Sequence, residues 1–230
     1  MKNIKWPTDK SAIIPALNLS ECNVFFDFDN TIVPFDVLDD IIKRFSNNGD
    51  WVVLEKAWRA GEIGSKECLE GQLRSIRITR DTLMQYLSKI KIDNYFPKLL
   101  TMLREKGTKP IVLSDSFSFI IENILRNNGI EGLKVYSNKM RFHKDRIVPL
   151  FPYTNKFCSG CANCKTKRLP SNGSRNKIVV YVGDGLSDIC PAQNADFVFA
   201  KGNLLEYFTN AAKPCVPFED LGDIYKYLTG

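Results

Sequence analysis

The sequence is poor in histidine and has no long apolar run. Its 230 residues include one histidine, His143, which argues against chemistry built on a histidine triad. No apolar segment approaches the ~20 residues of a membrane-spanning helix, and the longest clean ones, such as 178–182, have strand length. The segment Met1–Pro7 carries positive charge with no apolar stretch behind it, so we expect no secretory signal there.

The charge balance is ordinary for a globular protein. Lysine and arginine number 32 against 26 acidic residues, which gives +6, and 44% of the residues are hydrophobic. This composition excludes a disordered chain, a coiled coil and a disulfide-dense miniprotein. Because no block of five basic residues occurs, the positive charge suits a phosphorylated small molecule as well as nucleic acid.

The seven cysteines fall into two groups. Four are scattered along the chain, whereas Cys158, Cys161 and Cys164 form a C-x-x-C-x-x-C cluster. With no secretory signal, an odd cysteine count indicates a reducing, cytoplasmic compartment. The cluster could bind zinc, take part in redox or disulfide chemistry, or remain reduced. Reduced thiols are favoured, because structural zinc takes four ligands and His143 would have to fold back to complete the set.

Short apolar runs alternate with segments of helical periodicity. We expect strands at 23–28, 110–113, 134–137, 178–182, 196–199 and 214–216, and helices at 96–106, 117–127, 204–212 and 221–228. Most of the strand candidates are apolar throughout, as in strands buried on both faces of a parallel sheet. A β-hairpin is expected over 135–151, with its turn near Lys144. This order predicts a doubly wound, Rossmann-like α/β core.

One region interrupts the alternation. Between about residues 35 and 90 the pattern predicts helices at 36–46, 50–60, 65–75 and 79–89, with Ser65 and Thr79 as N-caps. A helical insertion directly after the first strand suggests a cap over the strand's C-terminal edge, where ligands bind in open α/β sheets. We therefore divide the chain into a core (1–33 and 92–230, with 1–21 as an N-terminal extension) and a helical cap (34–91).

Carboxylates follow two of the predicted strands. Asp27 and Asp29 end the first strand, and Asn30 and Thr31 come next. Two acids at a strand end repel each other unless a cation or a shared proton relieves them. Asp184 follows the strand at 178–182 between Gly183 and Gly185, glycines that allow the backbone to approach a ligand closely. Asp184 can therefore reach a metal ion, and Asp188, one helical turn further, can support it.

A hydroxyl stands at a third strand end. Ser114 follows Ile111–Leu113, and taken alone it is better explained as an N-cap of the helix predicted at 117–127.

In order, spacing and strand context, these motifs resemble the haloacid dehalogenase superfamily of phosphotransferases. Asp27–Thr31 is similar to the family's nucleophile motif, Ser114 to its hydroxyl motif, and Gly183–Asp188 to its acidic metal motif. The helical insertion resembles the cap of the phosphoserine-phosphatase-like branch. The stretches 61–68 and 158–165 look like the methionine-salvage phosphatases that act on 2-hydroxy-3-keto-5-methylthiopentenyl-1-phosphate, and the second also looks like phosphoethanolamine/phosphocholine phosphatases. The chain departs from the family in lacking the glycine common after Ser114.

The resemblance implies a phosphoric monoester hydrolase that depends on Mg²⁺. Asp27 would be the nucleophile that forms an aspartyl-phosphate, and Asp29 the general acid and base. The metal would be held by Asp27, the main-chain carbonyl of Asp29, and Asp184, with Asp188 and Gly185 in support. Ser114 and a lysine would hold the phosphoryl oxygens. Among Lys165, Lys167 and Lys177, we choose Lys165 because it follows the cysteine cluster, while Lys177 lies at the wrong end of its strand.

The implied substrate is a small phosphorylated metabolite, with neither nucleic acid nor a membrane as partner. Asn30, Ser114 and Asp36 are the expected substrate-binding residues, Asp36 at the entrance to the cap, with Arg59 and Glu62 as weaker candidates. Asp36 could instead simply be the N-cap of the first cap helix. The remaining alternatives are phosphonatase, phosphomutase or pyrophosphatase chemistry, or a catalytically silent binding module on the same fold.

Overall fold

The computed structural model of the protein describes residues 17–156, 160–171 and 176–230. In this part of the chain seven strands form one sheet in the order β4-β3-β2-β1-β5-β6-β7. Neighbouring strands are parallel, except that β3 and β4 form an antiparallel hairpin. The strands are β1 (Cys22–Phe26), β2 (Ile111–Phe117), β3 (Lys134–His143), β4 (Arg146–Leu150), β5 (Ile178–Gly183), β6 (Phe197–Ala200) and β7 (Val216–Pro217).

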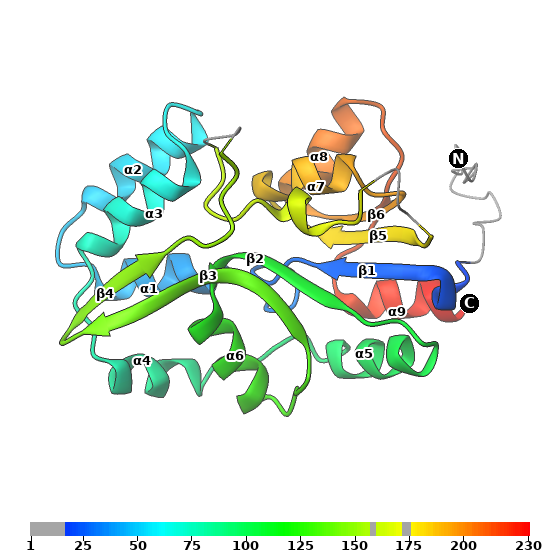
Figure 1. Cartoon of the computed structure of the whole chain (residues 1–230), viewed down its shortest axis with the longest axis horizontal. Helices are drawn as coiled ribbons and strands as arrows, with labels where there is room; N and C mark the ends of the chain where they lie inside the picture. The colour runs from blue at the N-terminus through cyan, green and yellow to red at the C-terminus, as the bar shows by residue number, and fades with distance from the viewer. Residues whose placement is uncertain (1–16, 157–159, 172–175) are drawn as a thin grey trace.

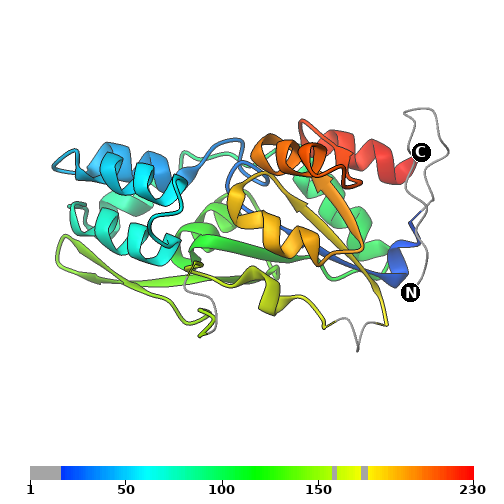
Figure 2. The same ribbon diagram turned by 90° about the horizontal axis from the view of Figure 1, so that it is seen from above.

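Helices cover both faces of the sheet, which confirms the doubly wound α/β fold. Figure 1 shows α5, α6 and α9 below the sheet and α7 and α8 above it, and Figure 2 gives the view from above. These helices are α5 (Phe96–Glu105), α6 (Ser118–Asn127), α7 (Ile189–Gln193), α8 (Gly202–Asn210) and α9 (Leu221–Thr229), and short 3-10 turns lie at η1 (Leu19–Glu21), η2 (Lys165–Arg168) and η4 (Leu186–Asp188). No described helix combines the length and apolar character needed to cross a bilayer.

Alternation along the central strands divides the core into two layers. Val180 and Val182 of β5 belong to the larger hydrophobic cluster, which α5, α6 and α9 cover. Val179 and Tyr181 point the other way, into the smaller cluster beneath α7 and α8. Because both faces are buried, the central strands are apolar at nearly every position.

Four helices lie between β1 and α5: α1 (Val37–Phe45), α2 (Asp50–Arg59), α3 (Ser65–Arg74) and α4 (Arg80–Leu87). They form the expected helical insertion, and α2 and α3 lie side by side beyond the strand ends (Figure 1). Thr79 caps α4 as predicted, since its side chain accepts a hydrogen bond from Thr82 N. The N-cap predicted for Ser65 is wrong: Gly64 holds that position, and the Ser65 hydroxyl hydrogen-bonds to the core instead.

β2 and β3 extend well beyond the apolar runs that predicted them, which ended at residues 113 and 137. β2 continues through Ser114 to Phe117, and α6 begins at Ser118, so the prediction of Ser114 as a helix N-cap is wrong. The register of β2 against β3 shifts between Leu113 and Phe117, which lets polar residues continue the strand. The hairpin turn is confirmed at Lys144, which adopts a φ of 57°.

Candidate active site

The C-terminal ends of three adjacent strands bring the predicted acids and hydroxyl together. β1 lies between β2 and β5, so Asp27, Ser114 and Asp184 reach the same edge of the sheet. Asp27 N donates to Val182 O at 2.8 Å, which continues the pairing of β1 with β5 up to the site. Ser114 is fully buried and Asp27 is 6% exposed. All three residues line one cavity of about 160 Å³.

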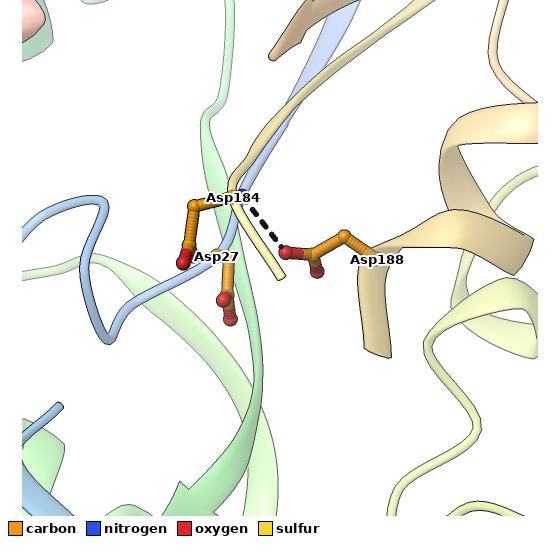
Figure 3. A group of neighbouring side chains, drawn as sticks. All are labelled: Asp27, Asp184 and Asp188. Carbon is orange, nitrogen blue, oxygen red and sulfur yellow. Dashed lines mark hydrogen bonds between the residues drawn. The ribbon is translucent and has the colours of Figure 1, made fainter. Parts of the chain in front are cut away.

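Asp27, Asp184 and Asp188 form an acidic cluster. One carboxylate oxygen from each lies within 4.8 Å of the others, and no other described side chains form such a three-residue group (Figure 3). Burial, followed by the charge of Asp188, raises the pKa of Asp27 well above its usual value. The same two causes raise the pKa of Asp184 to about 7. Crowded oxygen ligands of this kind suit Mg²⁺.

Within this cluster, Asp188 is already saturated with hydrogen bonds. Its Oδ2 accepts from Asp184 N and Gly185 N, both at 3.0 Å. Its Oδ1 accepts from Lys165 Nζ at 2.7 Å and from Tyr181 Oη at 2.6 Å. Burial opposes ionisation, but the charge of Lys165 and these hydrogen bonds hold the pKa of Asp188 below its usual value. Asp188 therefore fits a supporting role, whereas Asp27 and Asp184 make fewer hydrogen bonds and could hold a metal ion.

The glycine before Asp184 is required for this arrangement. A Cβ at Gly183 would lie 2.6 Å from Asp188 Oδ2, closer than any real Cβ contact, so only glycine leaves room for that carboxylate.

Lys165 is the lysine that reaches the site. Its side chain is buried, and Nζ lies 2.8 Å from Asp27 Oδ1 and 3.1 Å from Ser187 Oγ. Burial favours the neutral amine, but the charges of Asp188 and Asp27 outweigh it and raise the pKa of Lys165. Lys167 is exposed. Lys177 precedes β5 at the opposite end of the sheet and donates to Ser20 O at 2.9 Å.

The loop after β1 positions a second carboxyl. Asn30 adopts a left-handed conformation, with a φ of 53°, which turns the chain sharply after Asp29. Asp29 Oδ1 accepts from Val37 N at 2.9 Å. Burial, followed by the charge of Asp36, raises the pKa of Asp29 well above its usual value. A carboxyl with a raised pKa can carry a proton at neutral pH, as a general acid must.

The cavity extends from these groups to the helical insertion. Asp36, Asp39, Glu55, Trp58, Arg59 and Gln72 line that end. Asp36 also caps α1, accepting from Asp39 N at 2.8 Å, so the capping role weighed for it is confirmed. Arg59 is an exposed residue whose guanidinium pairs with Glu55. Glu62 is exposed and is not among the lining residues, so the structure does not bring it to the cavity.

The sequence analysis missed two residues that support the site, Tyr181 and Asn163. Tyr181 was treated only as part of a buried strand, although a tyrosine buried between apolar neighbours needs a partner for its hydroxyl. Asn163 donates to Ser114 O at 2.8 Å and to Tyr136 O at 3.0 Å, which ties the loop before Lys165 to β2. Of the three clustered cysteines, Cys158 lies outside the residues that the structure describes.

Comparison with known proteins gives consistent matches. A family model described as Putative Phosphatase matches residues 22–209. The chain is 24% identical over 209 residues to a 2-hydroxy-3-keto-5-methylthiopentenyl-1-phosphate phosphatase of Brevibacillus brevis, covering 89% of this chain and 94% of that protein. It is 29% identical over 168 residues to a phosphoserine phosphatase of Archaeoglobus fulgidus, covering 72% and 48%.

Solved structures share the fold. One described as a phospho-aspartyl intermediate analogue of phosphoserine phosphatase superimposes with a TM-score of 0.62 at 17% identity, covering 90% of this chain and 98% of the other.

Proposed function

Since the chain belongs to the Putative Phosphatase family and is a phosphoric monoester hydrolase of the haloacid dehalogenase superfamily, we propose that it is a Mg²⁺-dependent phosphatase acting through an aspartyl-phosphate. The observation that carries this proposal is the placement of Asp27. Its carboxylate is buried at the end of β1, 2.8 Å from a lysine ammonium, in the wall of the cavity. A nucleophile needs this combination of exclusion from water and access to the substrate.

In the first step an Asp27 oxygen bonds to phosphorus while the ester P–O bond breaks. Asp29 gives its proton to the departing alkoxide, so that an alcohol leaves. In the second step Asp29 takes a proton from water as the water oxygen attacks phosphorus. The acyl-phosphate bond breaks, inorganic phosphate is released and the Asp27 carboxylate is regenerated.

The magnesium ion would be held by Asp27, the main-chain carbonyl of Asp29, and Asp184. Asp188 would support this site indirectly, because it accepts four hydrogen bonds from the residues around it. When bound, the ion offsets the repulsion between a carboxylate nucleophile and a phosphate dianion. The raised pKa values of Asp27 and Asp184 support this assignment, because burial and the charge of Asp188 both oppose ionisation of these carboxyls, and a bound divalent cation would favour it.

Ser114 and Lys165 would hold the phosphoryl oxygens, where negative charge is spread in the transition state. Asn30 and Gly185 line the cavity next to the acids and complete this end. Lys165 remains charged at neutral pH because Asp188 and Asp27 raise its pKa.

The helical insertion, residues 34–91, would act as a cap that selects the leaving group, and residues 1–33 and 92–230 as the catalytic core. The cap end of the cavity presents the carboxylates of Asp36, Asp39 and Glu55. Acceptors of this kind favour a small phosphorylated metabolite whose alcohol part carries hydrogen-bond donors. The cysteine count supports a cytoplasmic location.

Phosphonatase chemistry finds less support. It requires a cap lysine whose amine is kept neutral by burial, to form a Schiff base. Lys43, Lys56 and Lys66 are all exposed.

The test is hydrolysis of a panel of phosphorylated metabolites, with Mg²⁺ and with a chelator. We expect release of inorganic phosphate from a subset of the panel only when Mg²⁺ is present, and none from the Asp27→Asn variant. Activity that survives the chelator would contradict the metal dependence. A wild-type protein that hydrolyses nothing in the panel, including a generic nitrophenyl phosphate, would contradict the function.

A further inference from the structure

A buried hydroxyl next to Ser114 has no hydrogen-bond partner among the residues that the structure describes. Ser116 is 2% exposed, and its Oγ makes no hydrogen bond to any described residue. Ser116 is nevertheless one of the residues that line the cavity, together with Asp27 and Lys165. Buried hydroxyls are nearly always hydrogen-bonded, because leaving one unpaired away from water is costly. An unpaired hydroxyl in the wall of a substrate cavity therefore indicates that a bound ligand supplies the partner.

The backbone places this hydroxyl beside Ser114. Ser116 N donates to Ser114 Oγ at 3.0 Å, in the part of β2 where the register against β3 shifts. This bond uses Ser114 Oγ as an acceptor and leaves its proton free to donate. The two serine hydroxyls therefore both belong to the second half of β2 (residues 114–117), each with a proton available to a ligand.

The charges of the site create a need for such donors. Lys165 Nζ already contacts Asp27, Asp188 and Ser187. A phosphoryl group presents several oxygens that each accept hydrogen bonds, and one shared ammonium cannot satisfy them. Between the two serines, the Asp115 carboxylate accepts from Ser65 Oγ of α3 at 3.4 Å, so it is directed to the helical insertion.

We propose that Ser116 donates a hydrogen bond to a non-bridging oxygen of the substrate's phosphoryl group, as a second hydroxyl beside Ser114. The inference rests on the phosphatase function proposed above. The proposed hydrogen bond is made to the phosphoryl group, which all phosphomonoesters share. Loss of the Ser116 hydroxyl should therefore slow hydrolysis to the same extent whichever alcohol leaves.

The test compares Ser116→Ala with Ser137→Ala. Ser137 is also a buried serine, 3% exposed on the neighbouring β3, but its hydroxyl has a backbone partner, Asn138 O, and it does not line the cavity. For Ser116→Ala we expect kcat/KM to fall about 10- to 100-fold for a large substrate and for nitrophenyl phosphate alike. The affinity for inorganic phosphate, measured by calorimetry, should fall with it. The Tm should stay unchanged or rise, because the variant removes an unpaired buried hydroxyl. Ser137→Ala should leave kcat/KM and phosphate affinity unchanged.

Three results would overturn the assignment: unchanged phosphate affinity in Ser116→Ala, a loss of kcat/KM confined to large substrates, or a lowered Tm with unchanged kinetics. The calorimetry separates this inference from the proposed function. Weakened phosphate binding in a protein that hydrolyses nothing would support Ser116 and reject the phosphatase. Unchanged phosphate binding in an active enzyme would do the reverse.

Discussion

Lys165 provides the positive charge that compensates the buried carboxylates of Asp27 and Asp188. Its buried ammonium lies within 2.8 Å of carboxylate oxygens of both Asp27 and Asp188. Without it, two buried carboxylates would face each other in a medium that screens poorly. Each partner depends on the other: the acids keep the lysine charged, and the lysine allows Asp188 to stay ionised. In the proposed mechanism Lys165 therefore has a structural role as well as a catalytic one.

We expect Lys165→Ala to lose both stability and activity. Removing one member of a buried ion pair costs about 3–5 kcal/mol, because the remaining charges are left uncompensated. The loss should be largest at neutral pH and smaller in acid, where Asp27 and Asp188 take up protons. Urea unfolding at pH 5 and pH 8 measures it, with Lys167→Ala, an exposed neighbour, as the control that should change little. Equal stability of Lys165→Ala and wild type at pH 8 would contradict this account.

The raised pKa of Asp184 predicts how the stability of the metal-free protein depends on pH. Burial and the charge of Asp188 raise its pKa from 3.8 to about 7 in the folded state. Between these values the folded protein holds a proton that the unfolded chain releases, so this group makes stability fall as pH rises. In chelator, wild type should lose stability relative to Asp184→Asn as the pH rises from about 4 to 7. Urea unfolding of both proteins across this window tests the sign, and parallel curves would refute it.

Sequence reasoning found the residues that stand in strand-end motifs and missed those that depend on tertiary contacts. Asp27, Asp29 and Asp184 follow apolar strands directly, so their meeting at one sheet edge could be predicted. The hydrogen bond from Tyr181 to Asp188 joins a strand to the turn after it. That the hydroxyl of Ser116 lacks a hydrogen-bond partner among the described residues can be recognised only from the three-dimensional structure. Nothing in the pattern separated these residues from ordinary core positions.

At the scale of elements, the helix starts show where local signals suffice and where they fail. Asp36 and Thr79 cap α1 and α4 through contacts within four residues, and both could be predicted. Ser65 has the same local signal, yet its hydroxyl accepts from Ala162 N at 2.7 Å, far away in the chain. Competition from a tertiary partner thus overrides the capping preference. The extension of β2 past Leu113 likewise depends on its pairing with β3.

The two confirmed caps form a matched pair for testing the cap's role. Asp36 lines the cavity and Thr79 does not. Asp36→Ala and Thr79→Ala should each lower stability by about 1 kcal/mol. Only Asp36→Ala should also slow a large substrate, about 10- to 200-fold, for one lost hydrogen bond of ~1.5–3 kcal/mol to a charged group. Nitrophenyl phosphate, which offers Asp36 no donor, should stay within a few-fold. Equal losses on both substrates would leave Asp36 with the capping role alone.

At the scale of the whole molecule, the charge of the cavity opposes the charge of the chain. The net charge of the chain is +6. The cavity wall, in contrast, carries more carboxyl groups than basic groups: its basic residues are Lys165 and Arg59, and Arg59 already pairs with Glu55. A phosphate dianion would be repelled from such a wall without added positive charge. The sheet order brings acids from two separate strands to one edge, and this is why a divalent cation belongs to the proposed reaction.

The covalent intermediate on Asp27 is the central claim, and trapping it is the most direct test. Wild-type protein with Mg²⁺ and its best substrate is quenched in acid during turnover, digested and analysed by mass spectrometry. We expect phosphate on the peptide that contains Asp27, removed by hydroxylamine as an acyl phosphate must be, and absent in Asp27→Asn. An Asp27→Asn variant that keeps more than about a tenth of the wild-type rate, roughly 1.4 kcal/mol of barrier, or phosphate on another residue, would contradict the account.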